Sequence, residues 1–216
     1  MRQTYDKLNP ENAFIWRIVH RDNIEWILDN GLHCGNSTTS YDKWVHIGNP
    51  DLTDRRSKHP VPVGPNGYLN DYVPFYFTPF SPMMLNIHSG RQGVAKRSND
   101  EIIILVSSLH RLKQLEVNFV YTDSHAYSKC TEFYTDLNDL DKIDWPLLQS
   151  RDFARDNNDL RKVERYQAEA LIHDNLPFSA LQGMVCYTQD IKENLDKQLK
   201  NRDMRSDIHA IKGWYF

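Results

Sequence analysis

The chain has little of what usually places a sequence in a known class. Among its 216 residues are only three cysteines, Cys34, Cys130 and Cys186. Their odd number and wide spacing argue against a disulfide framework or a zinc site and favour a reducing compartment. No run of 18 apolar residues occurs, so we expect no segment that spans a membrane and no membrane partner. The first residues have no apolar core or small-residue cleavage site, so we expect no signal peptide and a cytoplasmic protein.

Standard catalytic motifs are absent as well. The sequence contains no GxGxxG, no Walker A loop, no HExxH and no GxSxG. Nine histidines occur, but none stands at a metal-ligand spacing from cysteines or carboxylates, so no metal is expected. His20 ends an apolar segment, where a lone histidine is either a satisfied structural residue or part of a ligand pocket.

The composition is that of an ordinary globular protein, with 40% hydrophobic and 25% charged residues. This length suits one domain, predicted to span residues 1–216. The net charge of −3 shows that the whole molecule is not a basic nucleic-acid binder. Basic residues nevertheless cluster locally, either as solvated faces or as nucleic-acid contacts. The clusters are Arg55, Arg56, Lys58 and His59; Arg91, Lys96 and Arg97; and Arg161, Lys162 and Arg165.

The most informative stretch is DYVPFYFTPFSPMM, residues 71–84. Its aromatic and β-branched residues predict a buried strand. Pro74, Pro79 and Pro82 interrupt the stretch, although proline donates no ladder hydrogen bond. The segment is either a core strand with rigid ends or a recognition element. Ser81 and Pro82 are expected to cap and begin a helix.

Helices and strands follow one another without regular βαβ alternation, which predicts an α+β fold. Strands are expected at 14–20, 101–107, 117–122, 183–188 and 208–216. Helices are expected after an N-cap at Asp22, at 51–56, 109–115 and 189–200, whereas 145–155 is either helical or a loop. Residues 161–173 begin like a helix, but 169–173 could equally form a strand. The long irregular segment 34–70 is typical of a functional loop.

Glu169, in ERYQAEALI, is the best candidate for a catalytic carboxylate. If this stretch is extended, Gln167 and Glu169 lie on the same face. Such a pair suits a sugar nucleotide, because the carboxylate binds a ribose hydroxyl and stabilises positive charge on the sugar. The alternative is an exposed glutamate on an amphipathic helix. Arg55 and Arg56 either bind a pyrophosphate through their guanidinium groups or form a solvated turn.

Three stretches, in this order, resemble the DarT family of bacterial toxins. They are RIVHRDNIEWILDNGL (17–32), HIGNPDLTDRRSKHPVPVGPNGYLNDYVPFYFTPFSPMM (46–84) and WPLLQSRDFARDNNDLRKVERYQAEALI (145–172). The resemblance implies an ADP-ribosyltransferase-like fold, with a split mixed β-sheet, flanking helices and an NAD cleft. It also implies transfer of ADP-ribose from NAD⁺ onto thymidine in single-stranded DNA, and a macrodomain antitoxin, DarG, as partner.

Carried over by position, the resemblance makes Glu169 the catalytic glutamate and Arg55 a second catalytic residue that contacts the NAD⁺ phosphates or the thymine. It implies that Arg17, Ile18 and Val19 hold the nicotinamide amide through their backbone, with His20 in the pocket wall. No metal is implied, because NAD⁺ as cosubstrate carries the chemistry. Candidates for DNA contact are Arg56, Tyr72, Tyr76, Arg151 and Arg155, together with Lys162, Arg165, Tyr68, Trp145 and Phe153.

Two other functions are compatible with the same residues. One is an ADP-ribosyltransferase that acts on RNA or protein, and the other is a non-catalytic nucleic-acid-binding module. The sequence leaves open the preferred DNA motif, the oligomeric state, the antitoxin surface and the choice between Arg55 and Arg56.

Overall fold

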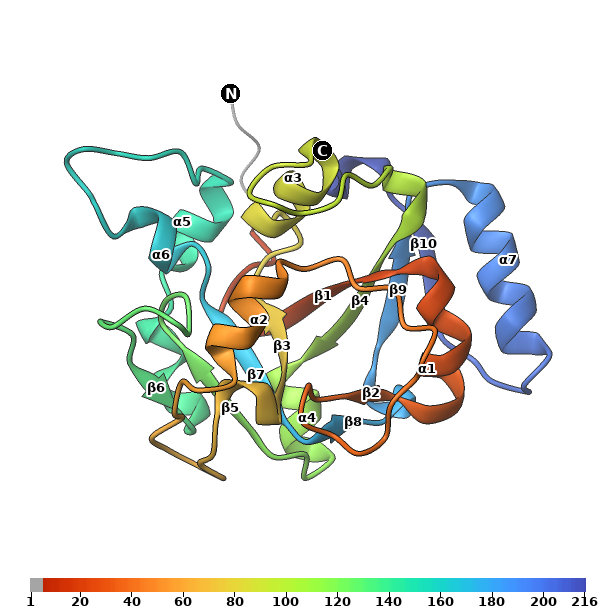
Figure 1. Cartoon of the computed structure of the whole chain (residues 1–216), viewed down its shortest axis with the longest axis horizontal. Helices are drawn as coiled ribbons and strands as arrows, with labels where there is room; N and C mark the ends of the chain where they lie inside the picture. The colour runs from red at the N-terminus through yellow and green to blue at the C-terminus, as the bar shows by residue number, and fades with distance from the viewer. Residues whose placement is uncertain (1–5) are drawn as a thin grey trace.

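The computed structural model describes residues 6–216. The prediction that the chain has no signal peptide concerns in part residues 1–5, which lie outside the described residues. Its centre is a mixed sheet of eight strands in the order β10-β9-β4-β1-β3-β7-β5-β6 (Figure 1). The strands are β1 Phe14–His20, β3 Tyr72–Tyr76, β4 Ile102–Ser108, β5 Phe119–Thr122, β6 Phe133–Tyr134, β7 Glu169–His173, β9 Gly183–Cys186 and β10 Asp207–Ala210. A separate ribbon pairs β2 (Leu32–His33) with β8 (Asn175–Leu176).

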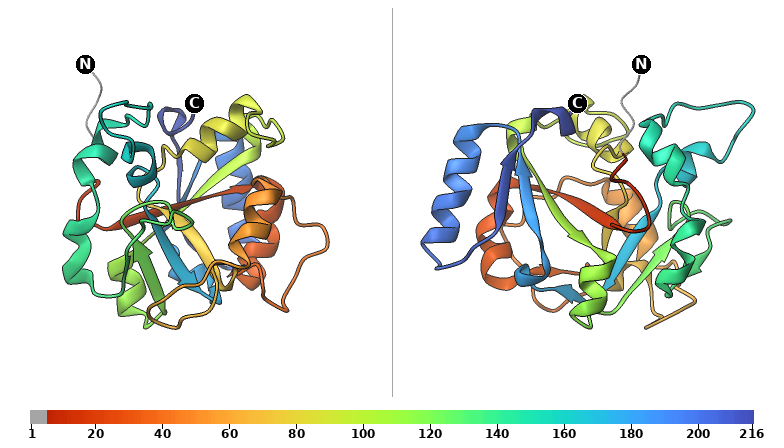
Figure 2. Two further views of the ribbon diagram at one scale, coloured as in Figure 1. Left: turned by 60° about the vertical axis from the view of Figure 1, so that its left-hand side comes forward. Right: turned by 180° about the vertical axis from the view of Figure 1, so that it is seen from behind.

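Seven α-helices of the described chain connect and flank these strands. They are α1 Ile24–Asn30, α2 Pro50–Arg56, α3 Pro82–Ser89, α4 Leu109–Gln114, α5 Trp145–Ser150, α6 Lys162–Arg165 and α7 Gln189–Lys200. Residues 151–161 extend away from the sheet between α5 and α6 (Figures 1 and 2). The expected α+β class is confirmed.

The sheet is split between β1 and β3. β1 pairs with β4 along its whole length, from Phe14 opposite Ser108 to His20 opposite Ile102. With β3 it shares only the pair Trp16 and Tyr76. Beyond that pair, β1 and β3 form no further β-pairing with each other. The expected split mixed sheet is confirmed.

Pro74 shows how a proline fits inside this sheet. Its carbonyl accepts a hydrogen bond from Arg17 Nη1 at 2.7 Å, so it points toward β1. The N–H and C=O of one strand residue point to the same side, so the donor that proline lacks would face the split. On the other side β3 pairs with β7 along its whole length. The proline therefore costs the sheet no ladder hydrogen bond.

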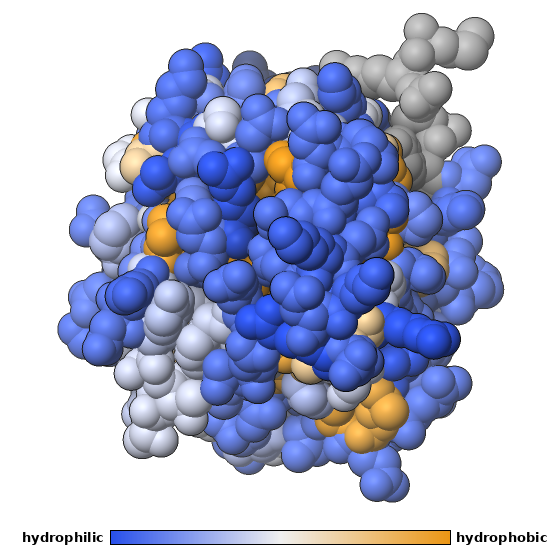
Figure 3. Space-filling view, turned by 90° about the vertical axis from the view of Figure 1, so that its right-hand side faces the viewer, coloured by the Kyte–Doolittle hydropathy of each residue, from blue (hydrophilic) through white to orange (hydrophobic). Residues whose placement is uncertain are grey.

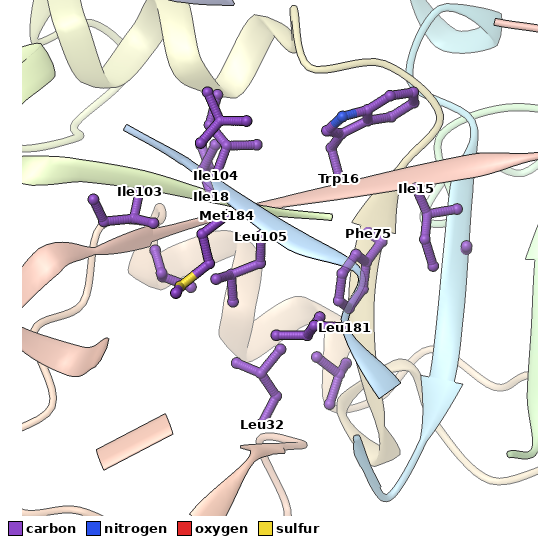
Figure 4. Packing of buried hydrophobic residues seen from close by; sticks show 14 of the residues in the cluster. Ile15, Trp16, Ile18, Leu32, Phe75, Ile103, Ile104, Leu105, Leu181 and Met184 are labelled. Carbon is purple, nitrogen blue, oxygen red and sulfur yellow. The ribbon is translucent and has the colours of Figure 1, made fainter. Parts of the chain in front are cut away.

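The main core lies against both halves of the sheet. Ile15 of β1, Phe75 of β3 and Leu105 of β4 are fully buried and belong to one cluster (Figure 4). Leu32 of β2 and Met184 of β9 join it, so strands distant in sequence share one apolar interior. Each such side chain contributes about 1.5–3 kcal/mol through its burial.

Helix α2, which follows the long irregular segment, and helix α3, which follows β3, each begin with a capping residue and then a proline. Asn49 accepts hydrogen bonds from backbone N–H groups in the first turn of α2, and Pro50 begins that helix. Ser81 accepts from the N–H of Met84, and Pro82 begins α3, as the sequence predicts. These caps fix the direction in which both helices leave the preceding segments.

Two expected boundaries are wrong. Asp22 does not cap α1: His20 caps a short 3-10 helix at Arg21–Asn23, and α1 begins at Ile24. The last strand ends at Ala210 and gives way to a 3-10 helix at Lys212–Trp214. After this turn the hydroxyl of Tyr215 points inward and lies within hydrogen-bond distance of two backbone carbonyls, 3.1 Å from that of Ile102 in β4 and 2.9 Å from that of Val185 in β9.

Gly31 follows α1 at a close approach of two backbones that the sequence did not reveal. Its φ of 79° is in the left-handed region, and a Cβ there would lie 2.5 Å from the carbonyl oxygen of Leu176. Only glycine fits here. This contact seats the β2–β8 ribbon at the end of α1.

Helix α7 packs beside β10, and the surface on this side of the molecule is mostly hydrophilic, with scattered hydrophobic residues (Figure 3). Within residues 6–216, none of the helices combines the length and the apolar character that crossing a membrane requires.

Glu101 fixes the start of β4 against the end of β1. Its carboxylate accepts from the Ser98 N–H at 2.8 Å and from Arg97 Nη1 at 3.2 Å, and it lies 3.4 Å from His20 Nε2. The Ser98 backbone hydrogen bond, assisted by the side chains of His20, Ser98 and Arg97, lowers the pKa of Glu101 to about 2. A carboxyl with a lower pKa in the folded state stabilises the fold when it is ionised.

We therefore expect Glu101 to contribute stability above about pH 4.5, and this contribution to disappear as the pH falls toward about 2. Glu101→Gln should be less stable than the wild type at neutral pH, and the two proteins should converge in acid. Urea unfolding between neutral pH and the acid range measures this. The exposed Glu11→Gln is the matched control. A parallel pH profile for Glu101→Gln and the wild type would contradict the prediction.

Candidate active site

Glu169 is the first residue of β7, and its side chain is buried inside the sheet. Its relative exposure is 1%. The backbone N–H donates to Thr122 Oγ1 of β5 at 3.0 Å, and Tyr76 of β3 lies opposite in register. Strands β3, β5 and β7 together therefore fix the position of this carboxylate.

The Glu169 carboxylate has two direct hydrogen-bond donors. Arg56 Nη1 lies 3.0 Å from Oε2 and 3.3 Å from Oε1, and the Ala126 N–H donates to Oε1 at 2.9 Å. His125 Nδ1 lies 3.9 Å from Oε1. A buried ion pair persists only when such partners compensate its desolvation. The arrangement holds the carboxylate in one orientation.

His125 is a site residue that the sequence did not reveal. It follows β5, and its Nδ1 accepts a hydrogen bond from the Tyr127 N–H at 3.2 Å. A neutral ring with an acceptor at Nδ1 carries its proton at Nε2. Nothing in the sequence around His125, which reads SHAY, forms a motif with another functional residue. Only the fold brings this histidine to Glu169.

Glu169, Arg56 and His125 line a cavity of about 380 Å³ beside the split in the sheet. Part of its wall is the β1 segment Arg17, Ile18, Val19 and His20, and another part is Tyr72, Pro74 and Tyr76 of β3. The structure therefore brings together Glu169 and the β1 segment, which stand far apart in the chain. Both are among the site residues that the sequence predicts.

Two guanidinium groups in the cavity wall retain free donors. Among the described residues, neither Arg17 Nε nor Arg56 Nη2 has a hydrogen-bond partner, although both atoms are buried. Burial lowers the pKa of Arg17 to about 10, so it remains positively charged at neutral pH. Buried N–H groups without partners are costly, so the cavity is suited to a ligand that carries anionic or carbonyl oxygens, as NAD⁺ does.

Of the two neighbouring arginines, Arg56 and not Arg55 reaches Glu169. The Arg56 side chain is only 11% exposed, whereas Arg55 is exposed and lies outside the cavity lining. The two residues are adjacent at the end of α2, where successive side chains point about 100° apart. The geometry therefore places Arg56 in the inward position.

The pairing of Gln167 with Glu169 depends on an extended stretch, and this condition is not met. Gln167 lies in a turn after α6 instead of an extended segment, and its Nε2 donates to the Val163 carbonyl at 2.9 Å. The strand begins only at Glu169. The period-two spacing of side chains therefore does not apply to these residues.

The residues expected to contact DNA lie in different surroundings. Tyr72 and Tyr76 line the cavity, whereas the Arg151 guanidinium lies 3.3 Å from the centre of the Phe80 ring. Arg155 is exposed on the projecting segment. Two of the remaining basic candidates form ion pairs within the protein: Lys162 with Asp152, and Arg165 with Asp144 and Asp159. Of the aromatic candidates, Trp145 is buried and Phe153 packs on Tyr166 and Phe216. Tyr68 is exposed.

The outer wall of the cavity comes from the irregular segment 34–49, which Asn23 holds in place. The buried Asn23 side chain donates to the Val45 carbonyl at 2.9 Å and accepts from the Val45 N–H at 2.8 Å. This reciprocal pair resembles one rung of a β-ladder. It fixes the irregular segment to the residues between β1 and α1.

Asn23→Ala should lower the free energy of unfolding by about 1–3 kcal/mol, because Val45 loses both hydrogen bonds. Urea denaturation measures the change. The control Asn194→Ala removes an exposed asparagine from α7 and should change stability by less than about 0.5 kcal/mol. Equal effects of the two substitutions would show that the Asn23 side chain does not hold the segment.

A buried carboxylate at the split between two half-sheets, with an arginine on it and cationic donors beside it, is an arrangement suited to NAD⁺-dependent ADP-ribosyl transfer. The chain belongs to the family described as ssDNA thymidine ADP-ribosyltransferase, DarT, which it matches over residues 16–216. The expected fold, activity and use of NAD⁺ as cosubstrate are thereby confirmed.

The relatives agree with this assignment. The chain is 58% identical to a DNA ADP-ribosyl transferase of Escherichia coli O127:H6 (strain E2348/69 / EPEC), over 97% of this chain and 96% of that protein. It resembles the structure of Thermus sp. 2.9 DarT in complex with ADP-ribosylated ssDNA, with a TM-score of 0.87 and 32% identity over 100% of both chains. The NAD⁺ complex of the same Thermus protein gives a TM-score of 0.83 at 30% identity, over 96% of this chain and 99% of that chain.

Proposed function

We propose that Glu169 and Arg56 are the catalytic pair that transfers ADP-ribose from NAD⁺ to thymidine in single-stranded DNA. The observation that carries this assignment is the buried Glu169 carboxylate in the cavity wall, which accepts hydrogen bonds from Arg56 and from the Ala126 N–H. Arg55, the arginine favoured from the sequence, is exposed and serves in our proposal as a surface residue.

Glu169 acts on the nicotinamide ribose. As the bond between C1′ and the nicotinamide nitrogen breaks, positive charge develops on the sugar and the departing ring becomes neutral nicotinamide. A fixed carboxylate stabilises that charge, and because β3, β5 and β7 already hold Glu169, no reorganisation is needed. A hydrogen bond from a ribose hydroxyl to this carboxylate orients the sugar.

The backbone of Arg17, Ile18 and Val19 is the proposed holder of the nicotinamide amide. β1 is a central strand instead of an edge strand, but its pairing with β3 is confined to Trp16 and Tyr76. The N–H and C=O groups that face the split are therefore available to an amide, which offers one acceptor oxygen and two N–H donors.

Arg56 is the proposed contact for the thymine. Its Nη1 holds Glu169 while Nη2 remains available to donate to a thymine carbonyl oxygen. Such a bond stabilises the ring as its nitrogen loses a proton and forms the new bond to C1′. The products are ADP-ribosylated thymidine, nicotinamide and one proton. A reacting Watson–Crick nitrogen must be unpaired, which accounts for a preference for single strands.

We also propose partners and a cellular location for the protein. Tyr72, Tyr76, Arg151 and Arg155 remain our candidates for holding the DNA strand, the first two from within the cavity. A DarG-like macrodomain that removes the modification is the proposed antitoxin, in keeping with the family. We further propose a cytoplasmic location. We also propose one domain over 1–216, because β1, near the start of the chain, and β10, near its end, belong to the same eight-stranded sheet.

The test is to incubate the protein with NAD⁺ and a thymidine-containing single-stranded oligonucleotide and to weigh the DNA by mass spectrometry. We expect a gain of one ADP-ribose on the single strand, and no gain on the duplex or on an oligonucleotide without thymidine. Modification of RNA or protein alone would overturn the assignment of the acceptor. Unchanged NAD⁺ with every acceptor would overturn the enzymatic function.

A further inference from the structure

Thr122, the last residue of β5, places a fully buried hydroxyl beside the backbone of Glu169. Its Oγ1 accepts a hydrogen bond from the Glu169 N–H at 3.0 Å and donates to the Ser124 carbonyl oxygen at 2.6 Å. The Glu169 carbonyl oxygen lies farther away, at 3.3 Å. A hydroxyl has one proton and two lone pairs, so it makes the two shorter bonds at once. This side chain therefore joins the start of β7 to the segment that follows β5.

The hydroxyl acts where the backbone pairing of β5 with β7 ends. The two strands pair as far as Tyr121, which lies opposite Ala170. The N–H of the preceding β7 residue, Glu169, is bound by the Thr122 side chain instead of a β5 carbonyl. A buried backbone N–H needs such a partner. Thr122 thus extends the hold of β5 on β7 by one residue, to the residue that carries the carboxylate.

The segment on the other side of Thr122 supplies a donor to the same carboxylate. The Ser124 carbonyl that Thr122 binds lies two residues before Ala126, and the Ala126 N–H donates to Glu169 Oε1 at 2.9 Å. One hydroxyl therefore contacts both the backbone of Glu169 and the segment that binds its side chain. Loss of the hydroxyl would let these two parts of the site move relative to each other.

We propose that Thr122 is a positioning residue for ADP-ribose transfer, which sets the Glu169 carboxylate and the Ala126 N–H in register. The effect on transfer rests on the proposed function of Glu169, but the hydrogen-bond link itself does not. A carboxylate stabilises a developing cation best when it is held in place beforehand. Thr122 is not among the described residues that line the cavity, so its loss should affect the chemical step and not substrate binding.

Thr122→Val tests the inference because it removes the hydroxyl and keeps the β-branched shape. Per folded molecule, kcat for transfer to a thymidine oligonucleotide should fall roughly thirtyfold. The KM values for NAD⁺ and for the oligonucleotide should both stay within about twofold. Thr122→Ser, which restores the hydroxyl, should recover most of kcat. Loss of folded protein alone would lower the yield and leave the kcat of the folded molecules unchanged.

Amide hydrogen exchange, measured by NMR, tests the link without any transfer reaction. In Thr122→Val the Glu169 and Ala126 amides should exchange at least roughly tenfold faster than in the wild type, relative to the amides of β1. Ser107→Ala is the matched control. Ser107 of β4 is equally buried, and its hydroxyl donates to the Ala180 carbonyl at 2.8 Å, outside the cavity lining. This control should leave kcat and both relative exchange rates within about twofold of the wild type.

A folded Thr122→Val protein whose kcat stays within about twofold of the wild type would overturn the inference, whatever its exchange rates. A lower kcat without faster exchange at either amide would overturn it as well, because the link would not be the cause. If Thr122→Val loses its folded thermal transition, Thr122→Ala decides by the same criteria.

Glu169→Gln, assayed in parallel, separates this inference from the proposed function. A Glu169→Gln protein that transfers ADP-ribose at the wild-type rate would reject the proposed function and the role of Thr122 in transfer with it. An inactive Glu169→Gln beside a fully active Thr122→Val would reject the role of Thr122 alone and leave the proposed function in place.

Discussion

Glu169→Gln is expected to slow ADP-ribose transfer by roughly a thousandfold or more while the protein stays folded. Glutamine has nearly the same shape, and its amide oxygen can still accept from the Ala126 N–H. It has no negative charge to stabilise the cationic sugar, and its NH₂ group would face Arg56 Nη1, donor against donor. The rate of DNA modification under single-turnover conditions, measured by mass spectrometry, gives the effect on the chemical step.

A second variant separates the charge from its position. Glu169→Asp keeps the charge but withdraws it by one methylene group, so it should also lose most of the activity. The exposed Glu193→Gln on α7 is the control for loss of one carboxylate and should be as active as the wild type. A Glu169→Gln protein that modifies DNA at the wild-type rate would reject Glu169 as the catalytic carboxylate.

Arg56→Lys should reduce the transfer rate roughly a hundredfold, although the positive charge is kept. The Arg56 guanidinium contacts both oxygens of Glu169 through Nη1 and presents Nη2 as a second nitrogen in the same plane, whereas all three donors of an ammonium group are on one nitrogen. Lysine is chosen over alanine because removing the charge would leave Glu169 buried without its partner and endanger the fold. Single-turnover rates on a thymidine oligonucleotide measure the loss.

Arg55→Lys is the matched control for this experiment. It makes the same chemical change at the neighbouring position, but Arg55 is exposed and outside the cavity lining, so its rate should stay within about twofold of the wild type. A large loss in Arg55→Lys together with an active Arg56→Lys would restore the assignment that the sequence favoured.

Much of the local structure could be predicted because it depends on neighbours in the chain. Ser81 and Pro82 set the start of α3, and the charged segment 189–200 was predicted as a helix with the bounds that α7 has. Glu169 could be singled out as well, through the resemblance of its surroundings to a known family. The exit of the chain from β10 could not be predicted, because the hydroxyl of Tyr215 is held by carbonyls of distant strands.

Patterns along the chain were enough to predict the class of fold, the family and the candidate catalytic carboxylate, because each prediction rests on short stretches of neighbouring residues and on the order of those stretches. The choice between Arg55 and Arg56 needed the folded molecule, because adjacent residues of similar chemistry differ here in the direction of their side chains. The same holds for His125, which only the folded chain brings within 3.9 Å of the Glu169 carboxylate. Which side chains meet at the split is a property of strand register, and register is set by the packed sheet as a whole.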